Sequence, residues 1–184
     1  MNQHDMTRNM VLAALFAALT AIGAFLQIPT GTVPITLQFL FTALAGLLLG
    51  WKWGAISQLL YVGIGLLGLP VFTQGGGIGY VLQPSFGFLL GLIPAAAVIG
   101  ALTARRTGYL NVLAAVLAGD LILYAVGVPY MYLILHVYMQ SAKTFPTLLA
   151  AMLVYVPGDT LKIIVVTALA PVLRRTLAKA VPNL

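Results

Sequence analysis

Three ionisable side chains stand inside long apolar stretches of the sequence, namely Asp120, Asp159 and Lys162. A charged group in hydrocarbon costs at least about 2.5 kcal/mol unless it is paired or hydrated, so each is a candidate functional residue. Asp159 and Lys162 stand at positions i and i+3, which places them on one face of a helix, where they can pair. The pair either meets a polar ligand or is an internal salt bridge that only stabilises its helix.

The two residues before Asp159 are Pro157 and Gly158, and they weaken a helix because proline lacks a backbone donor. A break here places Asp159 near the start of a half-helix, a position at which membrane transporters meet polar substrates. Asp120 has two interpretations. It pairs with Lys162 across the helix bundle, or it forms an acid/base pair with Asp159 in an intramembrane enzyme.

Other residues extend this candidate site. Gln38 begins an apolar run, and its side chain either bonds to the helix backbone or binds a ligand. Tyr80 and Gln83 either line a cavity or anchor the chain at the membrane interface. The loop over residues 70–84 is either a flexible linker or a lid whose backbone amides can approach a ligand closely. Its consecutive glycines are Gly75, Gly76 and Gly77.

The elements that position these residues follow from the composition. Of 184 residues, 61% are hydrophobic and 7% are charged, against roughly 45–50% and about 25% in soluble domains. This excludes a soluble globular protein and predicts an all-α integral membrane protein, a single membrane domain over residues 1–184. The six expected helices cover residues 9–28, 36–50, 54–69, 86–103, 110–139 and 145–173.

The second and third expected helices are joined only by Trp51, Lys52 and Trp53. Two indoles and one ammonium suit a membrane interface. The short connection predicts a tight helical hairpin.

Several classes of chemistry are excluded by what the chain lacks. It has no cysteine and two histidines, so it offers no disulfide, thiolate or metal cluster. It also has no Ser/His/Asp set and no phosphate-binding loop with lysine, so we expect no enzyme activity, no metal and no cofactor. Spanning helices leave no length for a nucleotide-binding domain, so any ATP must be used by partner subunits.

The basic residues predict the orientation of the chain. Lys143 and the loops over residues 29–35, 70–84 and 140–144 are expected outside, and both termini in the cytoplasm, by the positive-inside tendency. The basic residues expected on the cytoplasmic side are Arg8, Lys52, Arg105, Arg106, Arg174, Arg175 and Lys179. They are spread one or two per loop, so they form no patch for nucleic acid.

The first expected helix carries small residues at a spacing of four. Such spacing makes a shallow groove through which another helix can approach closely in lipid. The groove serves either for docking a partner protein or for packing within the bundle. Its residues are Ala13, Ala17 and Ala21, with Ala14 and Ala18 beside them.

Ordered motifs run along nearly the whole chain. After the alanine repeat come Val33-Pro34-Ile35-Thr36-Leu37-Gln38, Leu44-Ala45-Gly46, Gly65-Leu66-Leu67-Gly68-Leu69-Pro70, the glycine loop, Gln83-Pro84-Ser85-Phe86-Gly87 and Pro157-Gly158-Asp159-x-x-Lys162. Together they resemble the BioY family of biotin-uptake proteins, the substrate-binding S components of energy-coupling-factor (ECF) transporters. The resemblance implies a six-helix subunit in the cell membrane that captures biotin from outside. It also implies two kinds of partner, a transmembrane coupling protein (T component) and a pair of cytoplasmic ATPase subunits.

The resemblance also implies roles for individual residues. The family's helix-six acid and lysine correspond to Asp159 and Lys162, and its helix-two glutamine corresponds to Gln38. Its glycine loop corresponds to Gly75, Gly76 and Gly77, and its docking face to Ala13 and Ala17, with Ala14, Ala18 and Ala21. Some members carry an arginine early in helix four, where this chain has apolar residues such as Leu89. The resemblance therefore names no partner for the biotin carboxylate.

The chemistry of biotin fits the polar residues. A ureido ring offers two N–H donors and one carbonyl acceptor, which a carboxylate, an ammonium and a glutamine amide can satisfy. The thiophane ring and the valeryl chain need only an apolar, aromatic wall. The alternatives are an S component for another vitamin, an intramembrane enzyme and a self-gated channel.

Overall fold

A computed structural model describes residues 3–30, 33–105 and 108–180. Within these ranges the long helices are α1 (Gln3–Phe25), α2 (Gln38–Leu66), α3 (Phe86–Thr103), α4 (Tyr109–Leu133) and α6 (Val156–Ala180). All five are apolar and long enough to cross a membrane, α2 only when its two parts are counted as one helix. The shorter elements are strands β1 (Gln27–Ile28) and β2 (Ile35–Thr36), helix α5 (Phe145–Ala151), the 3₁₀ turns η1 (Ile78–Leu82) and η3 (Met152–Val154) and the π turn η2 (Ile134–Tyr138). The predicted all-helical membrane fold is confirmed.

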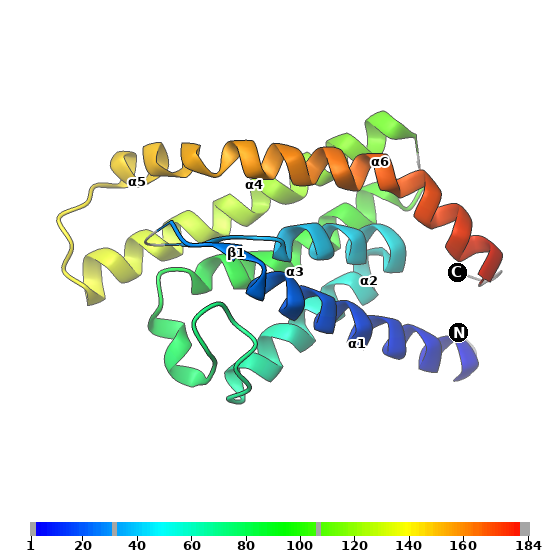
Figure 1. Cartoon of the computed structure of the whole chain (residues 1–184), viewed down its shortest axis with the longest axis horizontal. Coiled ribbons are helices and arrows are strands. Elements are labelled where there is room, and N and C mark those ends of the chain that lie inside the picture. Colours follow the sequence, from blue (N-terminus) through cyan, green and yellow to red (C-terminus); the bar gives the residue numbers. More distant parts are fainter. Residues whose placement is uncertain (1–2, 31–32, 106–107, 181–184) are drawn as a thin grey trace.

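The element α2 is a hairpin of two antiparallel arms, residues 38–49 and 51–66 (Figure 1). The reversal occurs at Gly50, whose φ of 78° favours glycine. The reversal brings residues of the two arms face to face. The Thr42 hydroxyl on the first arm, for example, donates to the Gln58 amide oxygen on the second at 2.9 Å. The expected turn at residues 51–53 is therefore wrong in detail, since these residues are already helical.

Other helix ends also differ from expectation. Helix α1 ends at Phe25, and the next residues form the strand β1, which pairs antiparallel with β2. The expected sixth helix over residues 145–173 is divided into α5, η3 and α6. Because of this division, α6 begins at Val156, within one turn of Asp159.

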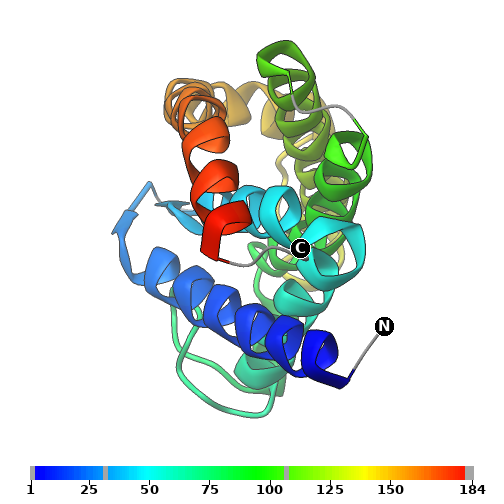
Figure 2. The same ribbon diagram turned by 90° about the vertical axis from the view of Figure 1, so that its right-hand side faces the viewer.

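The hairpin α2 lies at the centre of the bundle. It packs against α1 on one side and α3 on the other, and α4 packs against α3 and α6. The view along the long axis shows α2 between the blue helix α1 and the orange helix α6 (Figure 2). Close approach depends on small residues: a Cβ atom added to Gly46 would lie 2.4 Å from the Ala96 carbonyl oxygen. Side chains such as Phe39, Ile99 and Val166 fill the core.

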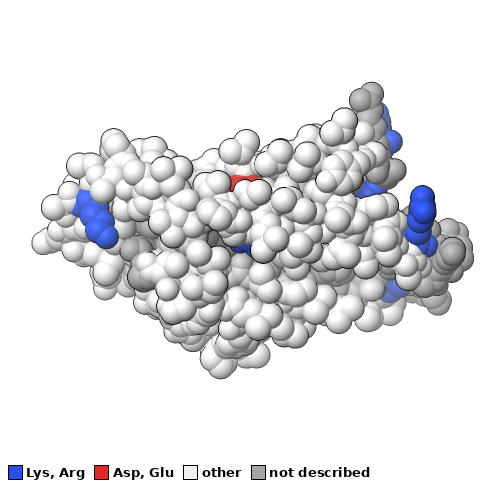
Figure 3. All heavy atoms as spheres, turned by 45° about the horizontal axis from the view of Figure 1, so that its top comes forward, with Lys and Arg blue, Asp and Glu red and all other residues white. Residues whose placement is uncertain are grey.

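The start of α1 and the end of α6 lie at the same end of the molecule (Figure 1). In Figure 3, basic side chains are concentrated at this end, and another basic side chain lies at the far end. Of the residues expected to set the orientation, Arg106 and the Lys179 side chain lie outside the described part. The start of the first arm of α2 and the start of α6 point toward the end opposite the termini (Figure 1).

Candidate functional site

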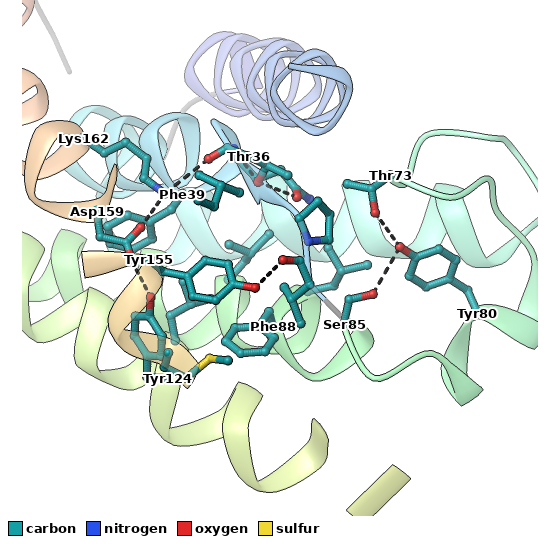
Figure 4. Close-up of a pocket in the computed structure, with 18 residues that line it drawn as sticks. Thr36, Phe39, Thr73, Tyr80, Ser85, Phe88, Tyr124, Tyr155, Asp159 and Lys162 are labelled. Atoms are coloured by element: carbon teal, nitrogen blue, oxygen red, sulfur yellow. Dashed lines mark hydrogen bonds and ion pairs between the residues drawn. The ribbon is translucent and has the colours of Figure 1, made fainter. Parts of the chain in front are cut away.

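A cavity lies where β2, the first arm of α2, and the helices α3, α4 and α6 meet (Figure 4). Most of its wall is apolar or aromatic, and its polar groups come from opposite sides. The residues that line it are Val33, Pro34, Ile35, Thr36, Gln38, Phe39, Thr73, Tyr80, Ser85, Phe88, Leu89, Leu92, Leu123, Tyr124, Met152, Tyr155, Asp159 and Lys162.

The pair of Asp159 and Lys162 forms one side of the cavity. The Lys162 Nζ atom is 2.5 Å from Oδ1 of Asp159, and both residues are 7% exposed. The Tyr124 hydroxyl on α4 donates to the other carboxylate oxygen, and Lys162 Nζ donates to the Thr36 carbonyl oxygen at 3.2 Å. Groups on β2, α4 and α6 therefore hold the two charges in place. These contacts lower the free-energy cost of placing the charges within the membrane.

The pair occupies the first two turns of α6. The helix is interrupted at residues 152–155, a few residues before the Pro157-Gly158 break that the sequence suggests. Pro157 stands in the first turn, where a helix needs no donor from it. The backbone amide of Asp159 donates to the carbonyl of Tyr155 at 2.9 Å. The half-helix start thus precedes Asp159 by one turn.

The Gln38 side chain lines the cavity, but both ends of its amide have partners within the chain. Its Nε2 donates to the Tyr61 hydroxyl at 2.9 Å, and its Oε1 accepts from the Thr36 hydroxyl at 2.9 Å. The Tyr61 hydroxyl in turn donates to the Val71 carbonyl at 3.1 Å. Gln38 therefore connects the cavity wall to both arms of α2 and to the loop after it.

The glycine loop is folded against the end of α2. Its Phe72 ring is 1% exposed, and it fits against Gly65, where an added Cβ would lie 2.1 Å from the ring. The amide of Gly77 donates to the Gly65 carbonyl at 2.7 Å. Phe72 also contacts the Tyr80 ring, with ring centroids 4.6 Å apart. The packed loop is therefore not a loose linker.

Only one of the loop and turn residues expected to bind a ligand lines the cavity. This residue is Tyr80, whose hydroxyl lies 2.9 Å from that of Thr73 and 3.4 Å from that of Ser85. Gln83 instead ends the turn η1. The other expected residues do not line the cavity, and their contact with a ligand stays a prediction; these are Gly75, Gly76, Gly77 and Gln83. Gly77 and Gln83 instead hydrogen-bond to the backbone of Tyr80.

Tyr124 is the residue that sequence reasoning missed, together with the cavity residues Thr73, Ser85 and Phe88. Its hydroxyl holds the carboxylate of Asp159 from a different helix. A signal for it exists in the sequence, because Tyr124 lies four residues after Asp120 and so shares its helix face.

Asp120 does not pair with Lys162, which corrects one of the two expectations for it. Among the described residues, Lys162 is paired with Asp159, and the Asp120 Oδ1 atom is buried without a hydrogen-bond partner. Asp120 lines a separate cavity between α4, α5 and the start of α6, to which Tyr124 also contributes.

The alanines of α1 lie on two different faces. Ala13 and Ala17 are 1% and 4% exposed, so they pack within the bundle, and their expected docking role stays a prediction. Ala14 and Ala18 are exposed, and Ala21 is half-buried. Only the exposed face can receive another protein without unpacking the helix.

Comparisons with known proteins agree with this geometry. Residues 1–179 match the model of the BioY family. The chain is 52% identical over 147 residues to a probable biotin transporter BioY of Lysinibacillus sphaericus, covering 79% of this chain and 75% of that protein. It is 35% identical over 164 residues to the biotin transporter BioY of Thermotoga maritima, covering 89% and 94%.

A solved structure supports the same relationship. The chain is similar to the crystal structure of the S-component for biotin from an ECF-type ABC transporter, with a TM-score of 0.83, 30% identity and 95% of each chain covered. The match over nearly the full length includes the helices that build the cavity. The chain belongs to the BioY family.

Proposed function

We propose that this chain is the biotin-binding S component of an ECF transporter, and that it captures biotin from outside the cell. Membership of the BioY family and the similarity to an S-component for biotin support the proposal. The observation that carries it is the buried Asp159–Lys162 pair on the wall of an otherwise mostly apolar cavity. Such a cavity suits a ligand with one compact polar group and a large apolar remainder.

The two charged groups match the ureido ring of biotin. The Asp159 carboxylate accepts hydrogen bonds from ureido N–H groups, and the Lys162 ammonium donates to the ureido carbonyl. Tyr124 positions the carboxylate for this task through its hydroxyl. The thiophane ring contacts the apolar wall, to which Phe88 and Leu92 contribute.

The function is binding rather than catalysis, and the chain needs no cofactor. Energy for release into the cell comes from ATP that two cytoplasmic ATPase subunits hydrolyse, and a transmembrane coupling protein carries it to the chain. The exposed small-residue face of α1 at Ala14 and Ala18 is the surface that this coupling protein contacts, because small side chains let helices approach closely.

The chain lies in the cell membrane with both termini in the cytoplasm. The distribution of basic residues supports this orientation, since cytoplasmic loops carry an excess of lysine and arginine. The loop after α2 then faces outside, on the side from which biotin arrives.

Isothermal titration of the purified, detergent-solubilised chain tests the proposal. We expect one biotin to bind per chain without ATP and without any partner subunit. An unrelated vitamin such as thiamine is the matched ligand control and should give no heat of binding. Absence of biotin binding, or equal binding of thiamine, would overturn the assignment.

A further inference from the structure

A second cavity lies next to the first, near the loop between η2 and α5. It has a volume of about 200 Å³, and Met152 and Tyr155 line both cavities. Its remaining walls are apolar except for hydroxyl groups and one cation. The residues that line it are Thr30, Met131, Lys143, Thr147, Leu148, Ala151, Met152, Val154 and Tyr155.

The cation that lines this cavity, Lys143, is exposed and forms no ion pair within the described part of the chain. The chain has three acidic residues and no more. Asp5 pairs with Arg8 near the start of α1, and Asp159 pairs with Lys162. The third, Asp120, lines a different cavity and forms no ion pair in the described part of the chain. An anionic ligand would therefore meet an uncompensated charge at Lys143.

We propose that this second cavity is an outer subsite that binds the carboxylate of the ligand, with Lys143 as its cationic partner. The inference rests on the proposed function, because biotin carries a neutral ring at one end and a carboxylate at the other. Lys162 is already neutralised by Asp159 at 2.5 Å, so the inner pair suits the neutral ring better than a second anion. Leu89 on the inner wall offers no charge.

The boundary between the two cavities is suited to a flexible chain. Tyr155 is held in place, because its hydroxyl donates to the Val33 carbonyl and lies 3.0 Å from the Thr30 hydroxyl. Met152 has an unbranched side chain with three rotatable bonds and can move aside at low cost. A valeryl chain can therefore pass beside Met152 from the inner cavity to the outer one.

Titration of wild type and Lys143→Met with biotin and with biotinamide tests the subsite. In biotinamide a neutral primary amide replaces the carboxylate, so it probes the charge alone. We expect Lys143→Met to lose at least about tenfold in biotin affinity, the lower limit for a hydrogen bond to a charged group, and to bind biotinamide like wild type. Lys143→Arg keeps the charge and should retain most of the affinity. Lys52→Met removes an exposed lysine from the other end of the molecule and should change neither ligand.

The outcomes separate this inference from the proposed function. A wild-type chain that binds neither ligand would refute biotin binding itself. A wild-type chain that binds biotin, combined with Lys143→Met that leaves biotin affinity unchanged or weakens both ligands equally, would refute the outer subsite alone. If Lys143→Met binds biotin like wild type but associates less tightly than wild type with phosphatidylglycerol vesicles, Lys143 would be assigned to lipid phosphate instead.

Discussion

The buried pair of Asp159 and Lys162 can be tested for stability and for binding separately. In Asp159→Asn the ammonium loses its counter-ion and keeps neutral acceptors such as the Thr36 carbonyl. In Lys162→Met the carboxylate loses its counter-ion and keeps the Tyr124 hydroxyl among the described residues. Both residues are largely shielded from solvent, and removing one member of a buried pair costs about 3–5 kcal/mol. Each single variant should lose about this much stability. The double variant leaves no unpaired charge and should recover most of the loss.

Biotin affinity should not recover in the double variant. A hydrogen bond to a charged group contributes about 1.5–3 kcal/mol, and the double variant loses two of them to the ureido ring. The sum of at least about 3 kcal/mol corresponds to at least about a hundredfold loss in affinity. A pair that only stabilises α6 predicts the opposite, a folded double variant that binds biotin normally.

The assay combines isothermal titration with thermal unfolding of the same detergent-solubilised samples. The matched control is Asp5→Asn, because Asp5 and Arg8 have the same i, i+3 spacing near the start of α1, at 3.3 Å. This control should bind biotin with wild-type affinity. A stable double variant with wild-type biotin affinity would refute the ligand-binding role of the pair.

Three further predictions concern single side chains. Tyr124→Phe should weaken biotin binding about fivefold to tenfold in the same titration, because the buried carboxylate loses one donor; unchanged affinity would contradict its positioning role. Ala18 is exposed, so Ala18→Trp should abolish biotin uptake by cells that contain the coupling subunits but leave biotin binding intact. Ala17 is buried, so Ala17→Trp should instead lower the unfolding temperature. Gly76→Ala should destabilise the chain and weaken binding, because its Cβ would lie 2.1 Å from a backbone carbonyl oxygen, whereas Gly79→Ala has open space and should melt like wild type.

Part of the site could be predicted from the sequence because it depends on neighbours along the chain. The spacing of Asp159 and Lys162 places them on one helix face wherever that helix lies, and the preceding proline favours a helix start close to them. Their cost in an apolar segment marks them as functional candidates without any knowledge of their surroundings.

The rest of the site depends on contacts between distant segments. Tyr124 bonds to a carboxylate 35 residues away, and Gln38 bonds to a hydroxyl 23 residues away. Composition and periodicity carry no information on such partners, because many polar side chains in the bundle have the same local pattern. The sequence therefore identified Gln38 as a candidate but could not show that its amide is already engaged.

What the sequence by itself determined is the membrane-spanning helical bundle, the family and the charged pair, since hydropathy, motif order and helical spacing are properties of the linear chain. Only the tertiary structure decided which face of α1 is exposed, because Ala17 and Ala18 have the same side chain and differ in what packs against them. The same holds for Gly76, which is confined by a carbonyl from another part of its loop. Packing in three dimensions, rather than residue type, separates the residues that bind or dock from those that hold the bundle together.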